Sequence, residues 1–389
     1  MLQLSEKMNR LGTETAFEVL ARAEALAREG RDIINLGIGQ PDFKTPPHVV
    51  EAAIKALHDG HHGYTPSPGI LPLRESVAAD LHRRRGVEIS PDRIVVVPGG
   101  KVTMFFAILM FGEPGVEILY PNPGFPIYES VIQFSGATAV PTPLLEDRDF
   151  SFDAGAVLDQ VTPDTRLLIL NSPANPTGGA MPRDEIDKLV KGLVDHPQVA
   201  VLSDEIYSRI SYDGRAHVSL LDYPEIADRL ILLDGWSKTY AMTGWRMGYA
   251  VWPAALVEGA TRLAVNCHSC VNAATQYAGI AALDGHQDAV DDMVRAFEER
   301  RRVIVDGLNA IPGFRCRTPG GAFYAFPNVQ GTGLDARSLQ RRLLEEAGVA
   351  TVAGTSFGHL GEGFIRFSYA NSIDNIQEAL KRIRTLLLD

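Results

Sequence analysis

From residue 93 to residue 234, short and almost uninterrupted apolar runs alternate with stretches of helical spacing. These runs are RIVVV, VEILY, RLLILN, VAVLSDE and RLILLD. Strands that are apolar on both faces are typical of a parallel sheet with helices packed on each side. The alternation therefore predicts an α/β fold with a mostly parallel central sheet flanked by helices.

Helical spacing of apolar residues also appears before and after this series. It predicts helices over residues 16–30, 47–60, 71–85, 288–311 and 336–347, and a last helix up to Leu388. Beyond about residue 285 the long charged helix is followed by the strand-like FIRFSYA, which is typical of a smaller α+β domain. We expect a large domain of residues 46–285, a small domain of residues 1–45 plus 286–389, and an active cleft at their junction.

The charge balance and the apolar runs exclude two classes of partner. The formal net charge is −11 and the pI is near 5.4, whereas a nucleic-acid-binding surface needs a basic face. The strongest apolar run, MFFAILMF at residues 104–111, is far shorter than the ~20 residues of a membrane span. The first residues, MLQLSEKMNRL, lack the basic start and continuous apolar core of a secretory signal. We therefore expect a cytoplasmic protein with no nucleic-acid or membrane partner.

Three cysteines are too few for a disulfide framework. Cys267 and Cys270 form a C-x-x-C, which is also half of a zinc site or a redox pair, but no second cysteine pair or histidine cluster completes a metal site. His61 and His62 are adjacent and therefore point in different directions. We expect packed thiols, Cys316 included, and no bound metal.

The run WSKTYAMTGWRMGY, at residues 236–249, follows the apolar stretch RLILLD and carries Lys238 and Arg246. An amine at the exit of a strand can condense with an aldehyde, and a nearby guanidinium can hold a phosphate. Together they suggest pyridoxal phosphate. The alternative is a solvated surface lysine and a helix-capping arginine, as most such residues are.

Asp204 and Tyr207, in VLSDEIY, and Asn175 follow two other apolar runs. A carboxylate buried after a strand needs a cation, and a protonated pyridine nitrogen is one. Tyr207 and Asn175 are candidates to donate to the ring oxygen of such a cofactor. The alternative for Asp204 is a helix N-cap.

In VVVPGGKVTMFF, Gly99 and Gly100 lie between a strand and the start of a helix. The exposed amides and the positive helix end favour an anion there, although a plain tight turn also accounts for the glycines. The segment is not a Walker A loop, since Val102 follows Lys101. Phe125 is a candidate to stack on a flat ring or to lie in the core.

Several motifs occur in order along essentially the whole chain: INLGIGQPDF, GYTPSPGILPLR, PGGK, YPNPGFPIY, NSPANPTGG, SDEIY, SKTYAMTGWRMGY, GGAFYAF and FIRFSYA. Together they resemble the class I/II aminotransferases of PLP fold type I, nearest the bacterial aspartate and aromatic aminotransferase groups. The runs NPTG and SKTYAMTGWRMGY are specific, whereas isolated glycines are not.

The resemblance implies a role for each matching position. It implies that Lys238 carries the cofactor pyridoxal 5'-phosphate, that Asp204 faces the pyridine nitrogen, and that Tyr207 and Asn175 donate to the ring oxygen. Phe125 matches the stacking aromatic, often Tyr or Trp, without its hydroxyl or indole contact. The phosphate contacts implied are Gly99, Gly100, Lys101 and Arg246. Gly235 stands where some members have a serine or threonine three residues before the lysine, so Ser237 is the nearest hydroxyl and the remaining candidate for the cofactor.

The resemblance also implies contacts to the substrate and to a second subunit. Arg366 matches the arginine that binds the substrate α-carboxylate, for which a planar bidentate donor is suited. Gly39 and Asn175 match positions near the same carboxylate. Tyr64 matches an aromatic that the neighbouring subunit supplies to the phosphate, which implies a homodimer with shared active sites.

The activity that follows is transamination in two half-reactions, with Lys238 as the general base. An L-amino acid of aspartate or aromatic type would be the donor and 2-oxoglutarate the acceptor. A pyridoxal-phosphate-dependent C–S β-lyase is the alternative, since one fold supports several chemistries. A transcription regulator with an aminotransferase-like domain is a third class, but no basic helix-turn-helix extension precedes residue 16. The sequence does not identify the residue that selects the substrate side chain.

Overall fold

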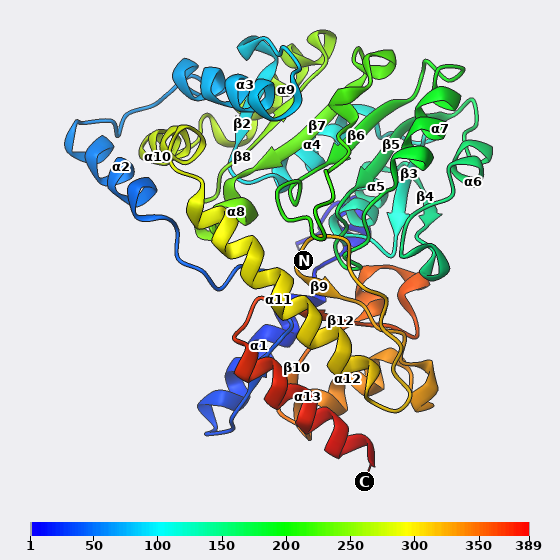
Figure 1. Ribbon diagram of the computed structural model, residues 1–389. Helices are drawn as coiled ribbons and strands as arrows, with labels where there is room; N and C mark the ends of the chain where they lie inside the picture. Colours follow the sequence, from blue (N-terminus) through cyan, green and yellow to red (C-terminus); the bar gives the residue numbers. More distant parts are fainter. Residues whose placement is uncertain (1, 389) are drawn as a thin grey trace.

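A seven-stranded sheet forms the centre of the computed structural model, which describes residues 2–388 (Figure 1). Its strands are β2 (Ile94–Val97), β3 (Glu117–Asn122), β4 (Thr138–Pro143), β5 (Thr165–Asn171), β6 (Ala200–Asp204), β7 (Leu230–Gly235) and β8 (Gly248–Val251). The order across the sheet is β2-β8-β7-β6-β5-β3-β4. Strand β8 is antiparallel to both neighbours, and the remaining neighbouring pairs are parallel. The predicted α/β fold with a mostly parallel sheet is confirmed.

Helices cover both faces of this sheet (Figure 1). They are α2 (Pro47–His58), α3 (Leu71–Arg85), α4 (Lys101–Phe111), α5 (Ile127–Ser135), α6 (Ala154–Asp159), α7 (Arg183–Leu193), α8 (Trp236–Thr239), α9 (Ala254–His268) and α10 (Ala273–Asp284). Alternate residues of β2 enter different cores: Val95 and Val97 pack with α4, α5 and α9, whereas Ile94 and Val96 pack with α3 and α10. Both faces are thus buried, and this explains why the strands are continuously apolar. We call the sheet and these helices the large body.

The remaining elements form what we call the small body. They are α1 (Thr15–Arg28), β1 (Ile34–Asn35), α11 (Asp288–Asn309), β9 (Tyr324–Ala325), α12 (Ala336–Glu345), β10 (Val349–Ala350), β11 (Val352–Ala353), β12 (Ile365–Ser368) and α13 (Ile373–Leu388). Strand β1 pairs in parallel with β10, so the chain near residue 34 lies beside the chain near residue 349. Strands β11, β12 and β9 form an antiparallel sheet. The division at residues 46 and 285 stays a prediction.

Most predicted elements are confirmed to within a few residues, but β4 and β8 were not predicted. Strand β4 contains Pro141 and Pro143 and lies at the edge of the sheet, where proline is tolerated. It is only partly buried, so it lacks the continuous apolar run of its neighbours. Strand β8 is four residues long and begins within the end of the lysine motif. The sequence therefore does not mark it as a separate strand.

The described part of the chain contains neither a membrane-spanning helix nor a metal-binding cluster. No helix within residues 2–388 is long and apolar enough to cross a membrane. Across the same residues, no group of three or more His, Cys, Asp and Glu side chains is arranged to hold a metal ion. The expected absence of a metal stays a prediction. The three cysteines carry free thiols, and Cys267 is exposed rather than packed, which corrects our expectation for that residue.

Replacing Phe297 with alanine tests the core of the small body. Phe297 is fully buried, 5.4 Å from Phe43 and 5.1 Å from Phe323 between ring centroids. The cavity left by Phe297→Ala should lower the free energy of unfolding by about 3–5 kcal/mol. Urea denaturation measures this change. The exposed control Val194→Ala should stay within about 0.5 kcal/mol of the unmodified protein, and equal effects of the two would contradict the packing described.

Candidate active site

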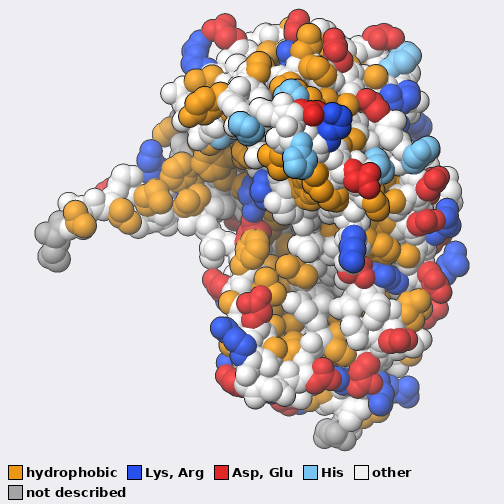
Figure 2. Space-filling model, turned by 90° about the vertical axis from the view of Figure 1, so that its left-hand side faces the viewer, with side chains coloured by type: hydrophobic (Ala, Val, Ile, Leu, Met, Phe, Trp, Pro, Cys, Tyr) orange, Lys and Arg blue, Asp and Glu red, His pale blue; other side chains and the backbone are white. Residues whose placement is uncertain are grey.

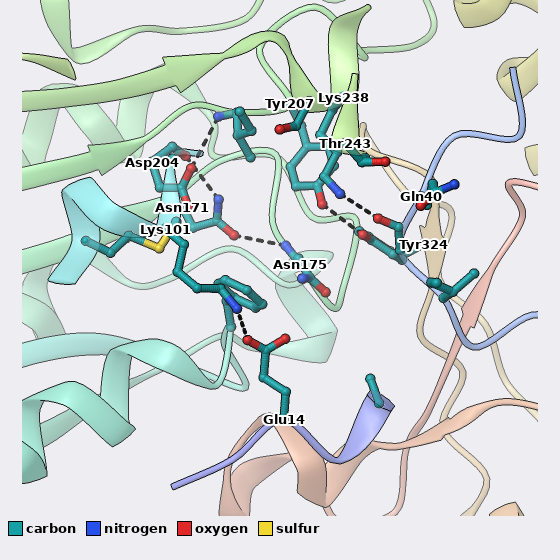
Figure 3. Close-up of a pocket in the computed structure, with 18 of the residues that line it drawn as sticks. Glu14, Gln40, Lys101, Asn171, Asn175, Asp204, Tyr207, Lys238, Thr243 and Tyr324 are labelled. Atoms are coloured by element: carbon teal, nitrogen blue, oxygen red, sulfur yellow. Dashed lines mark hydrogen bonds and ion pairs between the residues drawn. The ribbon is translucent and has the colours of Figure 1, made fainter. Parts of the chain in front are cut away.

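A cavity of about 450 Å³ lies at the carboxyl ends of β5, β6 and β7, where the small body meets the sheet (Figure 3). Asn171 ends β5, Asp204 ends β6, and Lys238 follows β7 in the short helix α8. Parallel strands end at the same edge of a sheet, so these polar side chains converge. The predicted site residues that line the cavity are Gly39, Gly100, Lys101, Phe125, Asn175, Asp204, Tyr207, Ser237, Lys238, Arg246 and Arg366.

Asp204 is a buried carboxylate that no cation of residues 2–388 pairs with. The Tyr128 hydroxyl donates to its Oδ2 at 2.6 Å, and the Ile206 amide donates to its Oδ1 at 3.3 Å. Burial raises the pKa of Asp204 to about 6. A cation placed in the cavity would stabilise the ionised form of this carboxylate.

Lys238 lies in the cavity wall, not on the outer surface. Its Nζ donates to the carbonyl oxygen of Gly39, which belongs to the small body. Burial, and then the charges of Arg366 and Arg246, lower the pKa of Lys238 to about 7. The interpretation as a solvated surface lysine is therefore wrong, and a large part of the amine is uncharged and nucleophilic at neutral pH.

Arg366, on β12, presents a buried guanidinium to the cavity. Its Nη1 donates to Oδ1 of Asn175 at 2.9 Å and its Nη2 donates to the carbonyl oxygen of Gly37, while Nε has no hydrogen-bond partner among the described residues. It lies 4.7 Å from the ring centroids of Tyr324 and Phe357. No carboxylate within the described residues forms an ion pair with it, so the site can accept an anion.

The turn between β2 and α4 and the side chain of Arg246 form a second cationic corner. Gly99 has φ +92°, and a side chain there would collide with the Arg246 guanidinium. Arg246 donates through Nη1 to the Thr243 carbonyl at 2.7 Å. Gly100 directly precedes α4, so the positive end of the α4 helix dipole lies at this corner. The corner suits a phosphate-sized anion.

The remaining predicted residues take different positions. Tyr207 shares a hydrogen bond of 2.8 Å with the hydroxyl of Tyr324. Phe125 lies edge-on to Tyr128 with ring centroids 6.0 Å apart, and the Lys101 amine stands over its ring. Lys101 also forms an ion pair with Glu14, so its contact with a phosphate stays a prediction.

Tyr64 does not lie in this cavity. Its side chain is 95% exposed, in a separate hollow with His61, His62 and Cys270. A place in the active site of this same chain is therefore excluded. The expected contribution of Tyr64 to a second subunit stays a prediction.

Glu14, Asn171 and Tyr324 line the cavity but were not predicted as site residues. Tyr128, which is outside the lining and donates to Asp204, was not predicted either. Asn171 donates to the backbone oxygen of Asp204 at 3.0 Å and accepts from the Asn175 amide at 2.9 Å. Tyr128 and Tyr324 occur in the motifs YPNPGFPIY and GGAFYAF, and Asn171 ends the run RLLILN, so a signal was present for these three. No pattern in the sequence marks Glu14.

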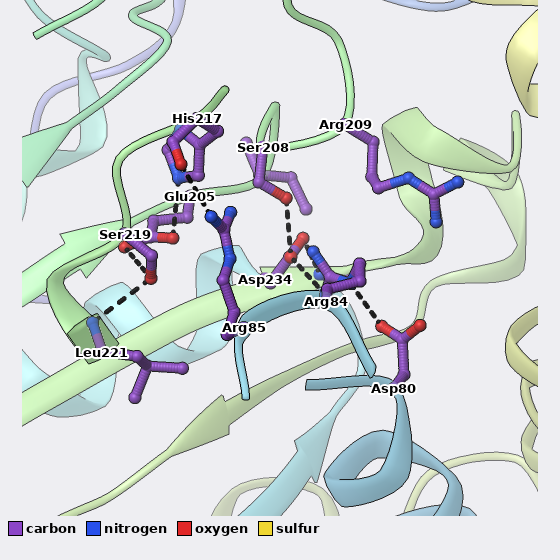
Figure 4. A network of polar contacts seen from close by, with 12 residues as sticks. Asp80, Arg84, Arg85, Glu205, Ser208, Arg209, His217, Ser219, Leu221 and Asp234 are labelled. Carbon is purple, nitrogen blue, oxygen red and sulfur yellow. Dashed lines mark hydrogen bonds and ion pairs between the residues drawn. The ribbon is translucent and has the colours of Figure 1, made fainter. Parts of the chain in front are cut away.

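A buried polar network anchors the residue next to Asp204 (Figure 4). Glu205 accepts hydrogen bonds from His217 at 2.7 Å and from Ser219 at 3.0 Å. Burial alone would raise the pKa of Glu205, but the charges of His217 and Arg85 hold it below its ordinary value. The network fixes the end of β6, so Asp204 points into the cavity from a rigid strand.

The chain is similar over almost its whole length to a family model, to other proteins and to solved structures. The family model described as aminotransferase class I and II matches residues 31–383. The chain is 36% identical to an aspartate aminotransferase of Geobacillus stearothermophilus over 99% of each chain. A crystal structure of the aspartate aminotransferase from Rhizobium meliloti matches with a TM-score of 0.94 at 35% identity, covering 100% of this chain and 99% of that chain. An aromatic aminotransferase structure from Pyrococcus horikoshii matches with a TM-score of 0.89 at 35% identity, covering 94% and 98%.

Acylation of the cofactor-free protein with acetic anhydride at a series of pH values tests the environment of Lys238. Because the uncharged amine reacts, labelling of Lys238 should rise with pH and level off above a midpoint near pH 7. In urea-unfolded protein the midpoint of the same peptide should move up to about 10.4, the ordinary lysine value. Mass spectrometry of the Lys238 peptide measures both curves. Coincident curves would show that the amine is not buried as described.

Proposed function

This chain belongs to the class I and II aminotransferases, and we propose that its cavity moves the amino group of an aspartate-type or aromatic L-amino acid to 2-oxoglutarate. The chain is a pyridoxal 5'-phosphate-dependent transaminase. One observation carries the proposal: an amine with a lowered pKa, a buried carboxylate and two guanidinium groups meet in one cavity, and no carboxylate of residues 2–388 pairs with either guanidinium.

The charges of the cavity fit this cofactor and an amino acid. Within residues 2–388, neither Lys238, Arg246 nor Arg366 forms an ion pair with a carboxylate. A cofactor phosphate and a substrate carboxylate would supply the missing negative charge. When bound, the cofactor supplies an aldehyde that takes up the amino group and a ring that withdraws electrons from the reacting carbon.

Each end of the cofactor would find a matching group. Arg246 and the amides that follow Gly99 and Gly100 would hold the phosphate. Asp204 would face the pyridine nitrogen, where a positive charge stabilises the ionised carboxylate. Tyr207 would donate to the ring oxygen, held in place by Tyr324.

Two residues would act on the amino acid. Arg366 would bind the α-carboxylate through its planar guanidinium, which Asn175 and Gly37 already orient. Since Oδ1 of Asn175 accepts from Arg366, its Nδ2 is left to donate to the ring oxygen. The Lys238 amine would take the proton from the substrate Cα, a role for which a pKa near neutrality is suited.

The substrate class rests on the relatives. Those of Geobacillus stearothermophilus and Rhizobium meliloti are named aspartate aminotransferases, and a Pyrococcus horikoshii structure is named an aromatic aminotransferase. We carry both donor classes over as proposals. No observation in the cavity favours the lyase alternative.

We also propose a homodimer with shared active sites. Exposed apolar side chains at Ile54, Leu57, Tyr64 and Val265 lie on or near α2 and α9. Figure 2 looks onto the α2 side and shows apolar side chains there among histidines, and an apolar N-terminal arm that extends from the body. A second subunit would cover these surfaces.

The proposed location is cytoplasmic, in keeping with three unbridged cysteines.

Replacing Lys238 with alanine removes the proposed base and the proposed attachment point. Turnover should fall by roughly a hundredfold to ten-thousandfold or more. After borohydride reduction, the unmodified protein should carry the cofactor mass on the Lys238 peptide and the Lys238→Ala variant should not. The exposed control Lys188→Ala (62% exposed) should behave like the unmodified protein. Retained turnover in Lys238→Ala would refute the assignment.

A panel of L-amino acids, each with and without 2-oxoglutarate, separates transaminase from lyase. A transaminase should form glutamate and the matching 2-oxo acid in equal amounts, and only when the acceptor is present. With cystathionine as substrate, pyruvate formed without any acceptor would instead identify a C–S β-lyase. Chromatography of the products measures both outcomes.

A further inference from the structure

The carboxylate of Glu14 forms an ion pair with the amine of Lys101 inside the cavity (Figure 3). Lys101 begins α4 of the large body, and Glu14 directly precedes α1 of the small body. The side chain of Glu14 is 20% exposed and that of Lys101 is 40% exposed. The pair therefore spans the two bodies at a place that solvent and substrate can reach.

Apart from this pair, the cavity wall that α1 and α4 supply is apolar. Ala16, Phe17 and Leu20 come from α1, and Met104 comes from α4. The Lys101 amine stands 5.1 Å from the ring centroid of Phe125. While Glu14 neutralises Lys101, this wall presents no net charge, which suits an apolar or aromatic side chain of a substrate.

Lys101 is also the cation available for a second carboxylate. The cationic side chains that line the cavity are Lys101, Lys238, Arg246 and Arg366. If the proposed function holds, Lys238 and Arg246 serve the cofactor and Arg366 serves the α-carboxylate. A dicarboxylic substrate such as 2-oxoglutarate would then need Lys101 to bind its distal carboxylate, but Glu14 already neutralises the charge of Lys101.

We propose that Glu14 determines specificity by competing with the distal carboxylate of a dicarboxylic substrate for Lys101. This inference rests on the proposed function and names a selecting residue within that site. Paired with Lys101, Glu14 favours neutral and aromatic side chains. Displaced from Lys101, it leaves the amine to the distal carboxylate. One cavity can thereby accept an uncharged donor and an acidic acceptor in turn.

The position of Glu14 keeps the free-energy cost of this exchange small. It lies in residues 11–14, which are neither helix nor strand, between the helical turn η1 (Glu6–Arg10) and α1. Its side chain can therefore rotate away without breaking a side-chain cap of α1, because it forms none. Partly exposed ion pairs contribute little stability, so a substrate carboxylate can replace one.

Replacing Glu14 with glutamine in the cofactor-loaded enzyme tests the proposal. Glutarate, a dicarboxylate without an amino group, serves as the probe in isothermal titration calorimetry. Its affinity should rise about fivefold in Glu14→Gln, and the KM for 2-oxoglutarate should fall in parallel. The kcat/KM for phenylalanine in single-turnover reactions should not rise. The matched control Glu18→Gln removes an exposed carboxylate from α1 and should change neither value.

A second variant, Lys101→Met, completes the test. Glutarate should bind more weakly to it, and Glu14→Gln should then give no gain. The proposal is overturned if Glu14→Gln leaves glutarate affinity unchanged, if Glu18→Gln has the same effect, or if Lys101→Met releases the cofactor, because Lys101 would then serve the phosphate. Failure of the unmodified enzyme to transaminate any amino acid would instead overturn the proposed function.

Discussion

Apolar side chains bury both faces of the central sheet, and this constraint determines where polar chemistry can occur. Core residues fill both sides of its strands, so only the strand ends tolerate ionisable groups. Asn171 and Asp204 end adjacent parallel strands, and Lys238 follows the next one. The cavity is therefore a consequence of the same apolar packing that stabilises the large body.

Burial acts on the two central ionisable groups in opposite directions. It raises the pKa of Asp204 to about 6 and lowers the pKa of Lys238 to about 7. Both pKa values thus lie close to neutral pH, where small changes in nearby charge alter the protonation of the two groups. Such opposed shifts are typical of sites that transfer protons. Within residues 2–388, no carboxylate forms an ion pair with the guanidinium groups of Arg246 and Arg366, so both keep the cavity cationic and able to bind anionic ligands.

Patterns local in the sequence predicted much of this structure, and contacts between distant segments were missed. The continuous apolar runs predicted β2, β3, β5, β6 and β7, because a parallel strand that is buried on both faces can be recognised from its own apolar residues. The position of Lys238 after β7 followed from the same runs. Glu14 and Lys101 are 87 residues apart, and their meeting depends on how the small body packs on the large one. Tyr128 donates to Asp204, 76 residues away in the sequence; its motif marks it as a candidate but does not show which residue it contacts.

The parallel pairing of β1 with β10 has a consequence for the order of assembly. Leu36 donates to the Ala350 carbonyl and accepts from the Ser368 amide. The carbonyl oxygens of Gly37 and Gly39, which follow it, accept hydrogen bonds from Arg366 and Lys238. On a ribosome, the first of these residues emerges more than three hundred residues before its partner exists. The large sheet can close early, but the catalytic centre is finished only after Arg366 of β12 has been translated.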